Sequence, residues 1–331
     1  MSLYRPLCIG KLSLPGNLFL APVAGYTDRA FRSICVEQGA DFTYTELVSS
    51  EALVRGGVKT QSLFRRADNE SRYCIQLFGS DPDVMYRATA MLTPQRPDLV
   101  DINCGCPVPK VVKTGSGAAL TRDPERLARI VEAVVHASQE HLDNTPVSVK
   151  IRSGWDAQAI NYRESASAAV AAGASIVALH ARTRDQGYEG KSNWAHIADL
   201  ASHVSVPVVG SGDLFAPQDA VAMLEQTACA AVMFARGALG NPFIFAETRS
   251  LLLTGSYEVP CLQDRIAVAF RQLALLASDV GEKSACLEMR KQFCAYTHGM
   301  TSAAELRSQL VHADTIDAYR ALFPSLPAML R

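Results

Sequence analysis

Short apolar runs recur along the 331-residue chain, and most are followed by a segment with the 3.6-residue period of an amphipathic helix. Eight of these runs predict strands: Leu18–Val23, Phe42–Glu46, Tyr73–Phe78, Leu99–Asn103, Val147–Ile151, Ile176–His180, Val206–Gly210 and Ala231–Ala235. Helices are predicted between them at Asp28–Gln38, Pro82–Leu92, Pro124–His136, Ala166–Ala172, Trp194–Ser202 and Pro217–Glu225. Buried-type strands that alternate with helices indicate a parallel sheet.

Eight is the number of strands that closes a (β/α)8 TIM barrel, and we expect this fold for residues 1–244. A doubly wound open sheet is the competing fold. It would usually carry a G-x-G-x-x-G turn after its first strand, and the stretch 23–28, VAGYTD, does not fit that pattern. A hairpin at Leu7–Leu12, turning through Pro15 and Gly16, is expected to cap the bottom of the barrel.

The tail, residues 245–331, has no strand-like alternation. Its patterns are helical, with breaks at Gly281, Gly299 and Pro324. The predicted helices lie near Gln263–Val280, Ala285–Tyr296, Ser302–Leu310 and Thr315–Phe323. We therefore expect a C-terminal all-helical domain.

Composition limits the function classes. The chain is 48% hydrophobic and carries a net charge of −1, so a nucleic-acid partner would need a local basic face. No apolar run approaches the ~18 residues of a membrane span, and the N-terminus lacks a signal-peptide pattern. We expect a cytoplasmic protein without a membrane partner. The nine cysteines are odd in number and irregularly spaced, which argues against a disulfide framework.

Polar residues close several of the apolar strands, at the barrel end that carries the reactive groups in this fold. Lys150 ends a buried strand and needs an anion or an electron-rich partner, although an inter-strand ion pair is the alternative. The nearby His180, Arg182 and Arg236 favour a ligand site. The stretches 211–213 (Ser-Gly-Asp) and 235–237 (Ala-Arg-Gly) follow the last two strands, where barrels often bind phosphate, although tight turns alone would also use these glycines.

Two cysteines flank Gly105 at the end of the fourth strand. Their spacing is wrong for zinc or for a redox pair, so no metal is expected. Strand alternation makes Cys104 a packing residue. Cys106 lies in the following loop, pinned by Pro107, and we predict that its thiol is an acid at the barrel mouth.

Five segments together resemble the tRNA-dihydrouridine synthases, most closely the bacterial B branch. They are 21–28 (APVAGYTD), 76–79 (QLFG), 101–107 (DINCGCP), 149–155 (VKIRSGW) and 180–184 (HARTR). The resemblance implies an FMN-binding barrel with a helical tRNA-binding domain. It implies that NADPH reduces the flavin, that the flavin delivers hydride to C6 of a uracil in tRNA, and that the loop cysteine protonates C5.

The same resemblance assigns residues. It makes Cys106 the proton donor and implies a flavin site of Pro22, Val23, Ala24, Gln76, Lys150, His180, Ser211, Gly212, Asp213, Ala235 and Arg236. Asn103 would face the flavin or the uracil, and Arg152 and Arg182 would bind the substrate. On the tail, Arg290 and Lys291 are expected to form a basic face with Arg271 and Lys283. Ser211, Ala235 and Ala181 depart from the residues usual in the family, which leaves the orientation of the flavin ring open.

Two other functions fit parts of the pattern. An FMN barrel that reduces free pyrimidines shares the fold and cofactor but has no use for a helical RNA-binding tail. A tRNA-binding protein with a dormant flavin site would accommodate the three departures. If the tail does not carry the RNA footprint, the loop that holds Lys110 and Lys113 is the next candidate.

Overall fold

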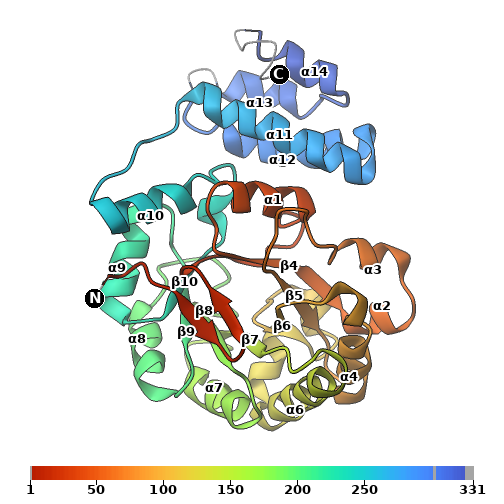
Figure 1. Cartoon of the computed structure of the whole chain (residues 1–331), viewed down its shortest axis with the longest axis vertical. Helices are drawn as coiled ribbons and strands as arrows, with labels where there is room; N and C mark the ends of the chain where they lie inside the picture. Colours follow the sequence, from red (N-terminus) through yellow and green to blue (C-terminus); the bar gives the residue numbers. More distant parts are fainter. Residues whose placement is uncertain (1, 301–302, 325–331) are drawn as a thin grey trace.

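The computed structural model of the protein describes residues 2–300 and 303–324, and its larger part is a closed barrel (Figure 1). Eight strands pair in the order β10-β3-β4-β5-β6-β7-β8-β9, and every neighbouring pair is parallel. They are β3 (Leu18–Leu20), β4 (Phe42–Ser49), β5 (Cys74–Phe78), β6 (Leu99–Cys104), β7 (Val147–Gly154), β8 (Ile176–Thr183), β9 (Val208–Ser211) and β10 (Ala231–Phe234). The predicted TIM barrel is confirmed.

Helices surround the barrel, and aspartates begin several of them. Asp28, Asp81 and Asp123 each accept a hydrogen bond from a backbone N–H of the first helical turn. The α-helices are α1 (Arg29–Glu37), α2 (Ser50–Val54), α3 (Val58–Ser62), α4 (Pro82–Ala90), α5 (Pro109–Val112), α6 (Pro124–His141), α7 (Tyr162–Ala171), α8 (Trp194–His203), α9 (Pro217–Thr227) and α10 (Ile244–Thr254). Three short 3₁₀ helices are η1 (Thr93–Gln95), η2 (Gly117–Arg122) and η3 (Arg236–Ala238).

An N-terminal hairpin closes the bottom of the barrel, but it turns earlier than the sequence predicts. β1 (Leu7–Ile9) pairs antiparallel with β2 (Leu12–Leu14). The turn lies at Gly10, whose φ of 56° is left-handed and easy for glycine, so the predicted turn at Pro15-Gly16 is wrong. The apolar side chains of both strands pack into the barrel interior against residues such as Phe19, Phe42 and Leu99.

The C-terminal helices have a core of their own. They are α11 (Leu262–Val280), α12 (Glu282–Tyr296), α13 (Ala303–Leu310) and α14 (Ile316–Ala321). Phe270, Phe293 and Phe323 pack ring against ring at their centre, with Tyr319 against Phe293. The predicted all-helical tail is confirmed, although Ser302, where the third helix was predicted to begin, lies outside the described residues.

The helix α10 belongs with the barrel by its packing. Ile244 and Phe245 are fully buried in the outer barrel core, and the ring of Phe245 meets that of Phe234 on β10 at 5.3 Å. The helical core begins only with α11. We therefore propose that the division between the two units falls between α10 and α11 rather than at residue 244.

The helical tail rests on α1, and Figure 1 shows α11 above this helix. Ala30 of α1 is buried in the core of the tail. Arg29 donates to Asp279 of α11 at 2.7 Å, and Arg271 of α11 donates back to Glu37 at 2.7 Å. These contacts make α1 the platform on which the tail is held.

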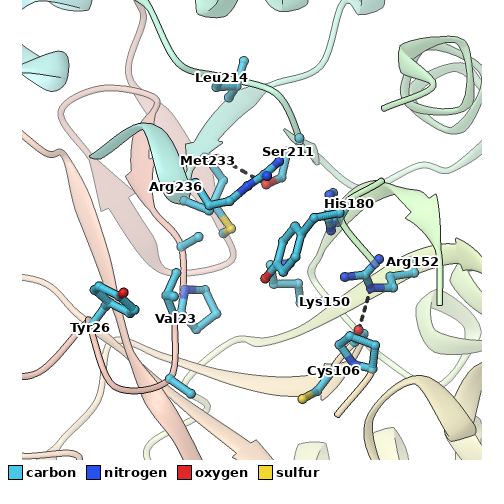
Figure 2. A pocket seen from close by; sticks show the side chains of 18 of the residues that line it. Val23, Tyr26, Cys106, Lys150, Arg152, His180, Ser211, Leu214, Met233 and Arg236 are labelled. Atoms are coloured by element: carbon cyan, nitrogen blue, oxygen red, sulfur yellow. Dashed lines mark hydrogen bonds between the residues drawn. The ribbon is translucent and has the colours of Figure 1, made fainter. Parts of the chain in front are cut away.

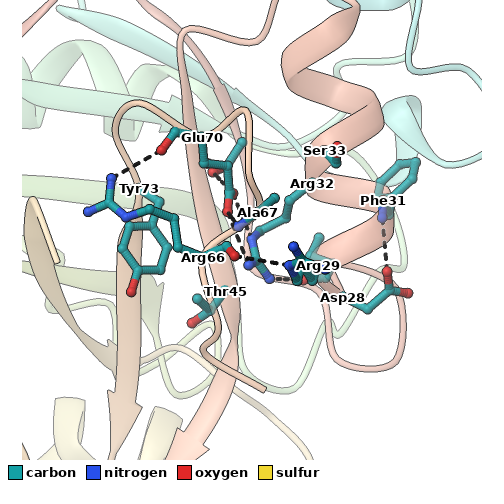
Figure 3. Close-up of polar contacts among 12 residues, drawn as sticks. Asp28, Arg29, Phe31, Arg32, Ser33, Thr45, Arg66, Ala67, Glu70 and Tyr73 are labelled. Carbon is teal, nitrogen blue, oxygen red and sulfur yellow. Dashed lines mark hydrogen bonds and ion pairs between the residues drawn. The ribbon is translucent and has the colours of Figure 1, made fainter. Parts of the chain in front are cut away.

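A buried ion pair fixes the platform itself. Figure 3 shows Arg32 of α1 directed at Glu70, which lies in the loop before β5. Arg32 Nε donates to Glu70 Oε1 at 2.8 Å, and both side chains have no exposed surface. Thr43 and the backbone N–H of Ala67 complete the partners of the carboxylate. A buried pair of this kind is retained only when the remaining donors and acceptors are also satisfied.

We found no helix among residues 2–300 and 303–324 that is long and apolar enough to cross a bilayer. The same residues contain no cluster of three or more His, Cys, Asp or Glu side chains that could hold a metal ion.

We predict that Arg32→Ala lowers the free energy of unfolding by about 3–5 kcal/mol, because it leaves the Glu70 carboxylate buried without its counter-charge. The double variant Arg32→Met, Glu70→Leu should lose less than the sum of the two single changes. Urea unfolding followed by circular dichroism measures both. Strict additivity of the single changes would contradict the pairing.

Candidate active site

A cavity of about 350 Å³ opens at the carboxyl ends of the barrel strands (Figure 2). Most of the side chains predicted for the site line it: Pro22, Val23, Ala24, Asn103, Cys106, Lys150, Arg152, His180, Ser211, Gly212, Asp213, Ala235 and Arg236. Gln76, Arg182, Arg290 and Lys291 do not line it. The parallel strands bring these residues together because their carboxyl ends meet at one rim.

Lys150 projects from β7 toward this cavity. No hydrogen bond or ion pair joins its ammonium group to any of the described residues, so the predicted alternative of an inter-strand ion pair does not hold. Burial and, to a lesser extent, the nearby charge of Arg152 lower the pKa of Lys150 to about 8, against the attraction of Asp101. A half-buried ammonium that no described residue pairs is costly, so this position favours an anionic or electron-rich ligand.

The two neighbouring cysteines have different surroundings. Cys104 ends β6 and is fully buried in the outer core, whereas Cys106 is half-buried and lines the cavity. Burial raises the pKa of the Cys106 thiol, outweighing the Val108 N–H and the charges of Arg152 and Lys150. The thiol therefore stays protonated near neutral pH, which suits a proton donor better than a nucleophile.

Arg152 ties two loops of the cavity wall together. Its Nε donates to the carbonyl of Gly105 at 2.8 Å, and its Nη1 donates to the carbonyls of Thr183 and Gly187 at 2.8 and 3.0 Å. Figure 2 shows this side chain reaching toward the Cys106 loop. Nε and Nη1 therefore hold the backbone of these two loops. Nη2 has no hydrogen bond to the described residues and is available to a ligand in the cavity.

Arg182, predicted to bind substrate, is buried in an ion pair instead. Its Nη2 lies 2.7 Å from both carboxylate oxygens of Asp213, and it also donates to the carbonyl of Gly190. Arg236 reaches the same carboxylate at 3.2 Å. The Asp213 carboxylate is thus held by two arginines and by the backbone N–H of Ser192.

His180 is neutral in this setting. Burial lowers its pKa well below 6.5, and the surrounding cations, Lys150 first among them, lower it further. Its Nε2 lies 3.3 Å from Nη1 of Arg182, which can only donate, so Nε2 accepts. The proton is then on Nδ1.

The loops after β9 and β10 approach each other closely. A Cβ on Gly237 would lie 2.0 Å from the carbonyl oxygen of Leu214. On the other side of the β9 loop, a Cβ on Gly212 would lie 2.3 Å from Ser192 Oγ, in the loop after β8. No hydrogen bond among the described residues uses the backbone N–H of Gly212 or Asp213. Free N–H groups beside Arg236 are suited to a phosphate. The Ser211 hydroxyl donates to the carbonyl of Met233, so it serves the strands rather than a ligand.

The other departures from the family pattern leave the cavity open. Ala235 lines it, and Ala181 turns its side chain into the outer core. Gln76 lies behind the cavity wall, where it holds Asn103 through a hydrogen bond of 2.8 Å. Asn103 lines the wall, but its side-chain oxygen binds the backbone of the Cys106 loop.

Three of the four tail cations expected to form one basic face have different surroundings. Lys291 lies 4.6 Å from the centre of the Tyr26 ring, and Tyr26 lines the cavity. Arg290 faces away, donating to the carbonyl of Ala313, and Arg271 is paired with Glu37. Lys291 is therefore the tail cation at the mouth of the site.

Tyr188 is a cavity residue that the sequence analysis missed. It lies in the loop after β8, is 55% exposed and covers the Arg236 guanidinium at 4.5 Å from its ring centre. The only signal in the sequence is an aromatic residue in a loop that follows a barrel strand.

The chain is similar to known proteins along most of its length. The family model described as dihydrouridine synthase matches residues 19–322. A probable tRNA-dihydrouridine synthase of Treponema pallidum (strain Nichols) is 52% identical over 326 residues, covering 97% of this chain and 96% of the relative. The tRNA-dihydrouridine synthase B of Xanthomonas axonopodis pv. citri is 35% identical over 315 residues, covering 95% and 93%. The structure of an old yellow enzyme homologue from Zymomonas mobilis is similar in fold, with a TM-score of 0.53 and 12% identity over 80% of this chain and 96% of that one.

We predict that iodoacetamide labels Cys106 but not Cys104 in the folded protein. Because the pKa of Cys106 is raised above its usual 9, the labelling rate should rise about tenfold per pH unit between pH 7 and 9. Peptide mass spectrometry measures both sites, with the exposed Cys261 as the reference thiol. A rate that levels off below pH 8 would mean that the thiol is activated rather than protonated.

Proposed function

The chain belongs to the dihydrouridine synthase family, and we propose that it reduces uridines of tRNA to dihydrouridine with a bound FMN. Membership makes it an oxidoreductase. The observation that supports the proposal is the cavity itself, which is lined both by the protonated Cys106 thiol and by the Lys150 side chain, whose ammonium has no partner among the described residues. The family match also extends through residue 322, so it includes the helical tail that a reductase of free pyrimidines would not need.

The residues present fit FMN. The free N–H groups of Gly212 and Asp213 and the guanidinium of Arg236 would hold the phosphate, with Gly237 allowing the close approach of the two loops. Lys150 would lie at the electron-rich edge of the ring system, and the Nδ1–H of His180 would donate to it. When bound and reduced by NADPH, FMN would supply the hydride that adds to C6 of the uracil.

Cys106 completes the reduction as the proton donor to C5. The thiol is protonated at neutral pH because of its burial, and the nearby charges of Arg152 and Lys150 stabilise the thiolate that remains. Proton transfer from a positioned acid contributes ~10²–10⁴-fold to a rate. Bulk solvent then restores the proton.

The uracil itself must leave the RNA stack to reach this cavity. Arg152 has a free Nη2 in the wall, and Tyr188 offers an exposed ring at the mouth, so we propose that these two side chains hold the flipped base. Lys291 and Tyr26 lie at the rim, where they would meet the phosphates and bases next to it. Because tRNA is the proposed substrate, we expect the enzyme to act in the cytoplasm.

We predict that Cys106→Ala keeps its FMN but loses about 10²–10⁴-fold in the rate at which tRNA reoxidises the reduced flavin. Reduction of the flavin by NADPH should stay near that of the wild type, because this step does not need the thiol. Cys104→Ala is the matched control, with a small loss of stability and near-normal turnover. Rapid mixing followed by flavin absorbance measures each half-reaction. Equal, severe losses in both variants would mean that Cys106 is not the acid.

We predict that Lys291→Gln weakens tRNA binding and flattens the slope of log affinity against log salt by ~0.7–0.9, the effect of one lost phosphate contact. FMN content and flavin reduction by NADPH should not change. Lys11→Gln, on the hairpin at the opposite end of the barrel, is the control variant. If affinity and slope are unchanged, the RNA footprint lies elsewhere, and Lys110→Gln and Lys113→Gln test the loop that holds those lysines.

A further inference from the structure

Three buried side chains form a continuous row of hydrogen bonds beneath the cavity. Asp101 and Asn103 of β6 point to the same side of the strand, and Gln76 lies beside Asp101 on β5. Gln76 Nε2 donates to Asp101 Oδ2 at 2.6 Å, and Asn103 Nδ2 donates to Gln76 Oε1 at 2.8 Å. Asn103 Oδ1 then accepts from the backbone N–H groups of Gly105 and Cys106 at 3.2 and 2.9 Å.

The two ends of this row decide the direction of every bond in it. An ionised carboxylate only accepts, so Gln76 must turn its NH₂ group toward Asp101. Its oxygen then faces Asn103, which must donate and so turns its own oxygen toward the loop. The backbone N–H groups of Gly105 and Cys106 can only donate, so they fit this arrangement and no other. Turning either amide over would oppose two donors or two acceptors in a buried site.

We propose that Asp101 is a positioning residue for Cys106: by fixing the orientation of Gln76 and Asn103, it holds the backbone that carries the thiol. The inference rests on the proposed function, in which Cys106 is the acid. Asp101 is fully buried and cannot touch a ligand. Its part in the reaction is therefore to hold the loop that carries Cys106.

The other restraints on the loop do not replace this row. Arg152 Nε binds the carbonyl of Gly105, and the N–H of Ala118 binds the carbonyl of Cys106 at 3.1 Å. Both hold carbonyl groups. Among the described residues, only Asn103 holds the N–H groups of Gly105 and Cys106. Loss of the correct Asn103 orientation would therefore release the N–H groups of Gly105 and Cys106, while their carbonyl groups stay bound.

The first experiment uses Asp101→Asn in the FMN-loaded enzyme. This isosteric side chain can present either oxygen or NH₂ to Gln76, so the direction of the row is then set only by the N–H groups at the loop end. We expect reoxidation of the reduced flavin by tRNA to slow by about tenfold, with reduction by NADPH changed less than about twofold. Ser148→Ala is the matched control, because it removes the other hydrogen bond to Asp101 and leaves the row intact. Equal losses in both variants would overturn the proposal in favour of a general role in barrel stability.

A double-mutant cycle separates positioning from support of the fold. If Asp101 acts only through the thiol, Asp101→Asn should have no further effect on reoxidation in the Cys106→Ala background. The same tenfold loss in that background would overturn the proposal. Should Asp101→Asn fail to fold, Gln76→Leu removes the middle link of the row without changing a residue that lines the cavity, and it enters the same cycle with the same expectations.

Thiol labelling tests the proposal without turnover. A loosened loop exposes Cys106 more often, so we expect iodoacetamide to label it at least about threefold faster in Asp101→Asn than in the wild type, with Cys261 as the internal reference. An unchanged rate would overturn the proposal. If wild-type enzyme is not reoxidised by tRNA, the proposed function fails, and the labelling result still decides whether Asp101 positions the loop.

Discussion

Four cations meet at one end of the barrel, and the repulsion among them is the constraint on which the site depends. Asp213 is the carboxylate that offsets it, binding both Arg182 and Arg236. Arg152 is satisfied by backbone carbonyls. Lys150 has no hydrogen-bond or ion-pair partner in the described part of the chain, and its pKa falls to about 8. The three arginines thus have protein partners in the cavity wall, although Arg152 and Arg236 still line the cavity, and Lys150 is the one of these four cations without a partner among the described residues.

The same surroundings set the protonation of the groups that face the cavity. His180 is kept neutral because burial and the neighbouring cations both disfavour its charged form. Burial keeps Cys106 protonated, and it prevails over the cations that would favour the thiolate. A neutral imidazole and a neutral thiol beside an ammonium group suit a site that receives an electron-rich ring and gives up a proton.

The helical tail depends on a different buried charge pair. Arg32 and Glu70 anchor α1 to the loop before β5, and α1 carries the tail through Arg29 and Ala30. Because the tail is fixed at this platform, Lys291 of α12 comes to lie over Tyr26 at the cavity mouth. The barrel cavity and the proposed RNA contact at Lys291 therefore keep a fixed position relative to each other.

The sequence by itself determined the eight strands, the helices of the tail and the rim on which Lys150, His180 and Cys106 lie. The strands and helices can be predicted because hydrophobic periodicity depends only on neighbouring residues. The rim can be predicted because the strands of a parallel barrel all end at the same face, whatever the length of the connections between them. The sequence also distinguished the packing role of Cys104 from the cavity position of Cys106, because alternation along the strand predicts which side chain is buried. Resemblance to a known family supplied the cofactor and substrate, which no periodicity reveals.

Only the tertiary structure decided which side chains pair with one another through hydrogen bonds and ion pairs. The sequence alone cannot tell whether the guanidinium of Arg182 lines the rim of the cavity or forms a buried ion pair. Its position beside Asp213, 31 residues away, places it in an ion pair that supports the wall. Arg271 pairs with Glu37, across 234 residues of chain, while more than half of its side chain stays exposed. Gln76 and Asp101 became links to the Cys106 loop because neighbouring strands brought them side by side. Such roles depend on distances between segments far apart in sequence, and those distances are set by packing.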